Sequence, residues 1–146
     1  MSGDVERLQA ILDGIPYAGF LGARAELRDG EALSVMPFAP HLIGNPMLPA
    51  LHGGATAAFL EMAAMAHLAT LNGEATHLPR PISVSIDYLR SGRPLATVAR
   101  PVVKRIGRRI ANVQVEAWQD GQGAPIAALH ANFLLSAGPA MPDQGK

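Results

Sequence analysis

A single carboxylate, Glu61, interrupts the most apolar stretch of this 146-residue sequence. Alanines, methionines and other apolar residues flank it on both sides, from residue 57 to residue 65. Burial among such side chains disfavours the charged form of a carboxyl group and raises its pKa, which suits a general base. Glu61 could instead face solvent or pair with a buried arginine, and both of these alternatives stay open. Glu61 is nevertheless the first candidate catalytic residue.

The run His52-Gly53-Gly54 is the second feature that could do chemistry. Two glycines at the start of a helix let another group approach the backbone, and the free amides there carry the positive end of the helix dipole. Such amides can bind the oxyanion that forms when an ester or thioester carbonyl is attacked. The alternative is that Gly53 and Gly54 only allow a tight start to the helix.

The spacing of these residues indicates a site shared by two chains. Gly53 and Glu61 are eight residues apart, which is ~12 Å along one helix axis. An oxyanion donor and the attacking water must both lie within ~3 Å of one carbonyl group. A second chain must therefore supply one of the two, and the small Ala57, Ala58 and Ala64 would permit a close approach of two helices.

Helices must position these residues. The continuous run of apolar residues predicts a helix from about Gly53 to Leu71. Because this helix is apolar nearly all round, we expect other elements to enclose it, as a curved antiparallel sheet would do. It is shorter than the ~20 residues of a membrane span and carries a charge, which favours a core helix and no membrane partner. An N-terminal helix within residues 1–17 should dock on the core through the apolar face formed by Val5, Leu8, Ile11 and Leu12.

Turn residues and alternating apolar residues indicate strands in the rest of the sequence. Two are expected at residues 20–28 and 32–38, joined by a tight turn at Asp29-Gly30, and three more at 95–106, 109–118 and 125–135. Alternation over residues 82–88 predicts a half-buried strand whose inner face carries Ile82, Val84, Ile86 and Tyr88. The order of elements predicts a single α+β domain over residues 1–146, with a flexible tail at 137–146.

Composition excludes several classes of protein. Twelve basic and twelve acidic residues balance, so nothing favours a nucleic-acid binder or a polybasic membrane protein. The absence of cysteine excludes disulfides and suits the cytoplasm. The histidines lack the paired spacing of a metal site, and no glycine loop for phosphates is present, so we expect neither metal nor cofactor.

Three motifs together resemble the hotdog-fold thioesterases of the phenylacetate-degradation and hydroxybenzoyl-CoA types, over about residues 18–136. They are His52-Gly53-Gly54 with Glu61, the strand Ser85-Ile86-Asp87-Tyr88-Leu89-Arg90, and the hairpin Gly107-Arg108-Arg109. The resemblance implies an acyl-CoA thioesterase with a sheet curled around the long helix. It also implies a homodimer, often doubled to a tetramer, with active sites at the subunit interface.

The resemblance also assigns roles. The amide of Gly53 polarises the thioester carbonyl, and Glu61 acts as general base or attacks the carbonyl directly. His52 and an upstream asparagine help to shape the site. Here Asn45 lies seven residues before His52, where six are expected, and the segment between them is rich in proline.

Local charge fits a coenzyme A substrate. Seven of the twelve basic residues lie between residues 90 and 109, and no acid occurs between Asp87 and Glu116. Arginine is a suitable planar donor for phosphate, so we expect Arg90 and Arg108 to bind the phosphates of the substrate. The alternative is a solvated hairpin edge whose charges oppose aggregation.

Two further functions stay open. A hotdog enoyl-CoA hydratase or dehydratase would need a His/Asp pair in place of the helix carboxylate. A non-catalytic acyl-CoA binding protein or sensor would have no use for a buried carboxylate, and this sequence shows no added DNA-binding module such as a helix-turn-helix.

Overall fold

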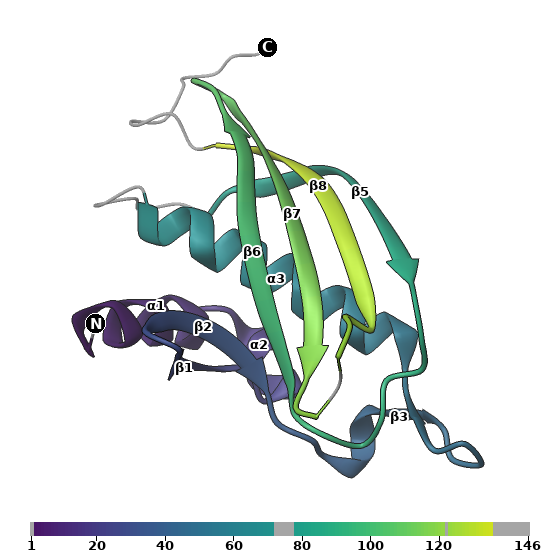
Figure 1. Ribbon diagram of the computed structural model, residues 1–146. Coiled ribbons are helices and arrows are strands. Elements are labelled where there is room, and N and C mark those ends of the chain that lie inside the picture. Colours follow the sequence, from purple (N-terminus) through teal and green to yellow (C-terminus); the bar gives the residue numbers. More distant parts are fainter. Residues whose placement is uncertain (1, 72–77, 122, 136–146) are drawn as a thin grey trace.

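A computed structural model describes residues 2–71, 78–121 and 123–135, which form a six-stranded antiparallel sheet, a small two-stranded sheet, a long helix and two shorter helices (Figure 1). The six strands lie in the order β1-β2-β6-β7-β8-β5. Their bounds are β1 Arg24–Arg28, β2 Glu31–Met36, β5 Arg80–Tyr88, β6 Thr97–Ile106, β7 Ile110–Gln119 and β8 Ala127–Leu134. All five pairings between neighbours are antiparallel.

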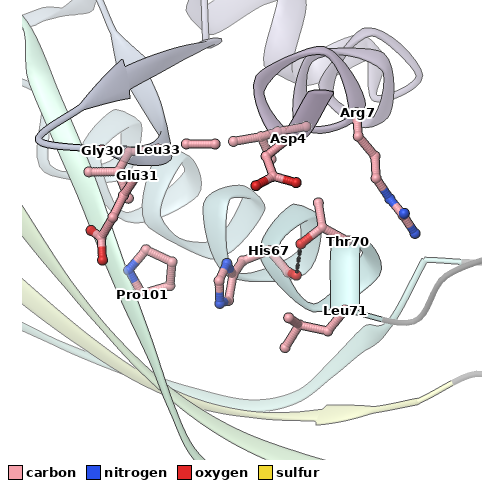
Figure 2. A pocket seen from close by; sticks show the side chains of 11 residues that line it. Asp4, Arg7, Gly30, Glu31, Leu33, His67, Thr70, Leu71 and Pro101 are labelled. Carbon is pink, nitrogen blue, oxygen red and sulfur yellow. Dashed lines mark hydrogen bonds between the residues drawn. The ribbon is translucent and has the colours of Figure 1, made fainter. Parts of the chain in front are cut away.

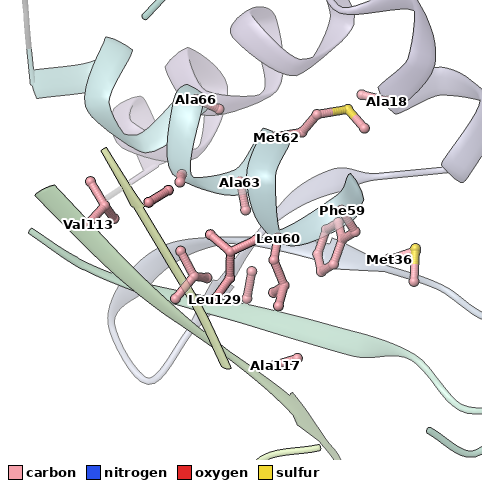
Figure 3. Close-up of a cluster of buried hydrophobic side chains, with 14 of the residues drawn as sticks. Ala18, Met36, Phe59, Leu60, Met62, Ala63, Ala66, Val113, Ala117 and Leu129 are labelled. Carbon is pink, nitrogen blue, oxygen red and sulfur yellow. The ribbon is translucent and has the colours of Figure 1, made fainter. Parts of the chain in front are cut away.

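The long helix α3, Gly53–Leu71, lies across one face of the sheet (Figure 1). Its Phe59, Leu60 and Ala63 are buried, and they belong to the same hydrophobic cluster as Val113 and Leu129 of the sheet (Figure 3). The bounds of α3 agree with the prediction, but the helix is enclosed on one side only, because Ala57, Ala58 and Met65 stay partly exposed. An α+β fold with a sheet wrapped around one long helix is the hotdog fold.

Two shorter helices, α1 (Ser2–Asp13) and α2 (Pro16–Leu21), pack on α3. The predicted docking of α1 is confirmed, because Leu8 and Leu12 are buried in the core. The first predicted strand is present but begins later than predicted, at Arg24 instead of Phe20, since Phe20 lies in α2. Proline in the first turn starts this helix, and Gly22, in the left-handed conformation with φ 79°, ends it.

The turn between β1 and β2 agrees with the prediction. Asp29 and Gly30 both have positive φ, 51° and 83°, as a two-residue hairpin turn of this hand requires. The segment between β2 and α3 also contains regular structure. It forms a short 3₁₀ turn, Pro40–Leu42, and a small hairpin of β3 (Ile43–Asn45) and β4 (Ala50–Leu51).

The prediction that β5 is half-buried is wrong for the single chain. Ile82, Val84 and Tyr88 are 55%, 43% and 55% exposed, and only Ile86 of the predicted inner face packs on the core. These side chains are exposed because β5 is an edge strand that pairs with β8 alone. The predicted flexible tail, 137–146, lies outside the described residues.

Within the described ranges, α3 is also the one helix long and apolar enough to cross a membrane. Half of that stretch is buried inside the fold, against the sheet and α1. A core helix of a folded domain accounts for these properties, as the sequence pattern predicts.

Candidate active site

The start of α3 is capped by the side chain of the residue before it. The amide of Gly54 donates a hydrogen bond to Nδ1 of His52 at 2.9 Å. Because Nδ1 accepts, a neutral His52 carries its proton on Nε2. His52 therefore satisfies one of the amides that a helix start leaves without a partner, and it fixes its own ring orientation in doing so.

Glycines allow the His52 ring to lie this close to the backbone. A Cβ atom at Gly44 of β3 would lie 2.7 Å from Cα of His52, and one at Gly54 would lie 2.9 Å from Cε1 of the ring. A larger residue at Gly44 would therefore require a backbone shift, and one at Gly54 would displace the His52 ring. Sequence reasoning missed Gly44, because its neighbour across the hairpin is set by strand pairing and not by a local pattern.

The amide of Gly53 keeps a free N–H at this helix start. In the part of the chain that the structure describes, the Gly53 N–H donates to no acceptor, whereas that of Gly54 is taken by His52. The carbonyl of His52, in the same peptide unit as the Gly53 N–H, accepts the amides of Ala55 at 3.0 Å and Thr56 at 3.2 Å. Hydrogen bonds in series polarise each other, which makes Gly53 a stronger donor.

Tyr88, the last residue of β5, lies against this helix start. Its hydroxyl donates to the carbonyl of Gly53 at 2.8 Å, and its ring approaches Gly53 so closely that an added Cβ would lie 3.1 Å away. Tyr88 and Gly53 also line a pocket of about 310 Å³, together with Thr56 and Arg90. Sequence reasoning placed Tyr88 on an apolar face and missed this contact.

Glu61 lies two turns further along α3, on a stripe of partly exposed residues. Helical spacing puts it on one side of the helix with Gly54, Ala57, Ala58 and Met65. The predicted contribution of Ala64 to this surface is wrong for the single chain, because Ala64 is completely buried.

Burial raises the pKa of Glu61 above its ordinary value, although the side chain is only partly covered. Among the described residues, no arginine pairs with it and no hydrogen bond reaches it. Pairing with a buried arginine therefore does not account for this carboxylate. Its charge is held at partial burial, and no described residue of its own chain compensates it.

Asn45 lies in the β3–β4 hairpin and is exposed. Its side-chain oxygen accepts the amide of Met47 at 3.0 Å, a local bond that shapes the hairpin turn. Within the described chain, no hydrogen bond joins Asn45 to His52 or Gly53. Its role in the site stays a prediction.

The two predicted phosphate ligands lie at opposite ends of the sheet. Arg90 follows β5, lines the Gly53 pocket and donates to the carbonyl of Pro125 at 3.1 Å. Arg108 lies in the exposed turn between β6 and β7, at the end where β5 begins, since Arg80 and Ile110 pair with the same residue of β8. One chain does not bring Arg90 and Arg108 together.

A second pocket, of about 360 Å³, lies near the other end of α3 (Figure 2). Its lining includes Asp4 of α1, Glu31 of β2 and His67 of α3. Burial lowers the pKa of His67, and the charge of Glu31 opposes that shift. None of the predicted site residues lies here, and across the described ranges no three metal-binding side chains gather in one place.

An antiparallel sheet around one long helix, with a free amide at the helix start and a carboxylate two turns later, defines a protein of the hotdog class. Residues 44–136 match the family of the acyl-CoA thioesterase N-terminal domain. The chain therefore belongs to this acyl-CoA thioesterase family. No curated protein matches it.

Solved structures agree on the fold. A protein from Chromobacterium violaceum is 34% identical, with a TM-score of 0.68 over 95% of this chain and 100% of its own. A candidate thioesterase related to phenylacetic acid degradation, from Ralstonia eutropha JMP134, is 22% identical, with a TM-score of 0.72 over 88% and 99%. A protein from Bacillus halodurans solved with CoA is 21% identical, with a TM-score of 0.68 over 90% and 92%.

Proposed function

We propose that this protein hydrolyses acyl-CoA thioesters to a free acid and coenzyme A at a site shared by two copies of the chain. The observation that carries the proposal is the pair of unused groups on α3. The Gly53 amide and the Glu61 carboxylate both lack a partner within the described chain, and both lie on the partly open side of one helix. Membership of the acyl-CoA thioesterase family supports the reaction class.

The shared site follows from helix geometry. Gly53 and Glu61 are separated by two turns of α3, or ~12 Å along its axis, so they cannot reach one carbonyl group together. Two α3 helices running antiparallel about a two-fold axis would place each Gly53 near the Glu61 of the second copy. Ala57 and Ala58, on the same stripe, leave room for this approach.

The exposed edge of the sheet supports a second copy in this position. An unpaired edge strand offers a row of backbone donors and acceptors to another strand. The apolar Ile82 and Val84 are exposed on β5, on the same margin of the domain as Tyr88 and the start of α3. We propose that two β5 edges pair to form the homodimer, and that dimers can associate further into a tetramer.

In the proposed reaction, the thioester oxygen accepts the Gly53 N–H as negative charge develops on it. Glu61 of the second copy either takes a proton from an attacking water or attacks the carbonyl carbon itself. In either route the carbon–sulfur bond then breaks, and the sulfur leaves as the CoA thiolate, which takes up a proton. Direct attack leaves the acyl group on Glu61 as an anhydride, and water then hydrolyses this anhydride to release the free acid and restore the carboxylate. The raised pKa of Glu61 makes it a stronger base once it is ionised.

Coenzyme A also fits the placement of the basic residues. Antiparallel pairing of two β5 strands would bring the Arg80 end of one strand next to the Tyr88 end of the other. The β6–β7 turn of the second copy, with its Arg108, would then approach the side of the site that Arg90 borders. We propose that these two arginines, from different copies, bind phosphates of one CoA. The Bacillus halodurans relative solved with CoA supports a CoA ligand.

A thiol-release assay tests the proposal. Hexanoyl-CoA, palmitoyl-CoA and phenylacetyl-CoA cover short, long and aromatic acyl groups, and the last is included because of the Ralstonia eutropha relative. We expect steady release of thiol from at least one of them, unchanged by a chelator. No release from any acyl-CoA, together with tight binding of the intact thioester, would instead favour an acyl-CoA sensor.

A further inference from the structure

The hydroxyl of Tyr88 has no part in the reaction proposed above, yet it makes a specific contact at the site. It donates to the Gly53 carbonyl at 2.8 Å across 35 residues of sequence. The ring lies flush against the same residue, where an added Cβ would come within 3.1 to 3.2 Å of ring carbons and the hydroxyl oxygen. Only glycine at position 53 allows this approach without a shift.

The peptide unit that Tyr88 holds is also held at its other end. Its carbonyl belongs to Gly53 and its N–H to Gly54, and that N–H donates to His52 Nδ1 at 2.9 Å. Two side chains, one from β5 and one from the residue before α3, therefore fix a single peptide plane. The preceding peptide plane carries the free Gly53 N–H.

Gly53 links these two peptide planes, and glycine has the widest choice of backbone angles. If the second plane were free to rotate, the direction of the Gly53 N–H would vary with it. An oxyanion donor contributes most when it is already aimed at the place where charge develops. Fixing the Gly53–Gly54 plane is therefore a way to aim the donor.

We propose that Tyr88 is a positioning residue of the oxyanion hole, which holds the Gly53–Gly54 peptide through its hydroxyl and so orients the Gly53 N–H. The inference rests on the proposed thioesterase function and adds to it a residue outside the catalytic pair. Tyr88 itself does not touch the reacting atoms. Its side chain is 55% exposed, so removal of the hydroxyl costs the fold little, and its effect falls on the geometry of the amide.

The test is Tyr88→Phe, which keeps the ring and removes the hydroxyl. The substrate is the one of hexanoyl-CoA, palmitoyl-CoA and phenylacetyl-CoA that the wild type hydrolyses fastest. We expect kcat to fall about tenfold, because one hydrogen bond is lost, while KM changes little. Tyr17→Phe is the matched control, because Tyr17 is similarly exposed and makes no hydrogen bond among the described residues. It should leave kcat, KM and the melting temperature unchanged.

A second readout does not depend on turnover. In Tyr88→Phe, hydrogen exchange of the Gly54 amide, measured by NMR, should become faster than in the wild type, because the peptide plane gains freedom. The Tyr17→Phe control should leave this exchange rate as it is.

Three outcomes would overturn the positioning role. They are a wild-type kcat in Tyr88→Phe, a raised KM with unchanged kcat, which would mean contact with substrate, and an unchanged Gly54 exchange rate. If the wild-type protein hydrolyses none of the three thioesters, the proposed function fails instead, and the exchange measurement alone decides whether Tyr88 orders the peptide.

Discussion

The buried and the partly open sides of α3 differ in what satisfies their side chains. The buried side carries Phe59 and Leu60, whose side chains are completely covered by the sheet and by other elements of the same chain. The partly open side carries small residues and Glu61, whose charge has no partner in the described chain. Folding of a single chain buries one face of the helix and leaves the other face partly exposed.

Within one helix, the buried face contributes to stability, and the partly open face carries the groups of the proposed site. Large apolar side chains on the buried face supply the hydrophobic free energy of folding. Small residues on the other face contribute little area, but they leave Glu61 and the Gly53 amide accessible. The exposed β5 edge lies on the same margin of the domain, which is why we propose that a second copy completes this face.

Replacing the carboxylate should have the largest effect. In Glu61→Gln we expect kcat to fall by ~10²–10⁴-fold, because the amide has a similar shape but can neither accept a proton nor attack a carbonyl. Substrate affinity and oligomeric state should change little. The matched control is Glu6→Gln, on the exposed face of α1, which should have wild-type kinetics. Unchanged turnover in Glu61→Gln would refute a catalytic role.

Truncation on the two faces of α3 should lower the free energy of unfolding by different amounts. Leu60→Ala removes a completely buried side chain, and we expect the free energy of unfolding to fall by about 2–5 kcal/mol. Met65→Ala, on the partly open stripe, should lower it by less than about 1 kcal/mol. Urea unfolding at one protein concentration measures both. An equal loss in the two variants would show that the open stripe is part of the core.

A charge on the β5 edge should separate the subunits. Val84→Lys puts a strongly hydrated ammonium on the strand through which we propose the copies pair, so light scattering should give the mass of one chain. Thioesterase activity should fall with it. Val102→Lys is the control, since Val102 has a similar exposed fraction on β6, away from that edge. A fully active Val84→Lys monomer would exclude the shared site.

The smallest expected effect is on stability against pH. Burial raises the pKa of Glu61 in the folded chain, so the folded state favours the neutral carboxyl. Its ionisation therefore destabilises the fold as pH rises above the ordinary carboxyl value of 4.5. Thermal unfolding of Glu61→Gln at pH 7 should occur at the wild-type temperature or slightly above it, and the difference should vanish below pH 4.5. A lower melting temperature at pH 7 would point to a lost ion pair.

The sequence predicted the core of the fold better than its edge. The helix from Gly53 to Leu71 was predictable because glycines mark its start and continuous apolar character marks its enclosure. Alternation along β5 looked like that of a half-buried strand, because alternation does not distinguish a strand inside a sheet from one at its edge. Helix α2 was missed, since its six residues are too few to show a helical period.

Site residues divide in the same way. Gly53 and Glu61 could be found because each breaks a local pattern, the first with backbone freedom and the second with charge. Gly44 and Tyr88 could not, because their importance comes from contacts with segments that no local pattern links to them. The hydroxyl of Tyr88 reaches Gly53 from 35 residues away. Gly54 was predicted as a second donor, and only the position of the His52 ring reveals that its amide is already occupied.

The most direct test of a shared site is complementation between two inactive variants. One is Glu61→Gln, and the other is Gly53→Pro, which removes the N–H at the first helical position, where a proline is otherwise tolerated. The ring of Tyr88 lies close to Gly53, so the fold and mass of Gly53→Pro are checked first by circular dichroism and light scattering.

The two variants are then unfolded together, refolded as a mixture and assayed for thiol release. If each site takes Gly53 from one chain and Glu61 from the other, half of the randomly formed dimers contain one intact site, and activity returns to about one quarter of the wild type. If each site lies within one chain, every site carries a defect. A mixture with mixed dimers but no more activity than its separate components would contradict the account.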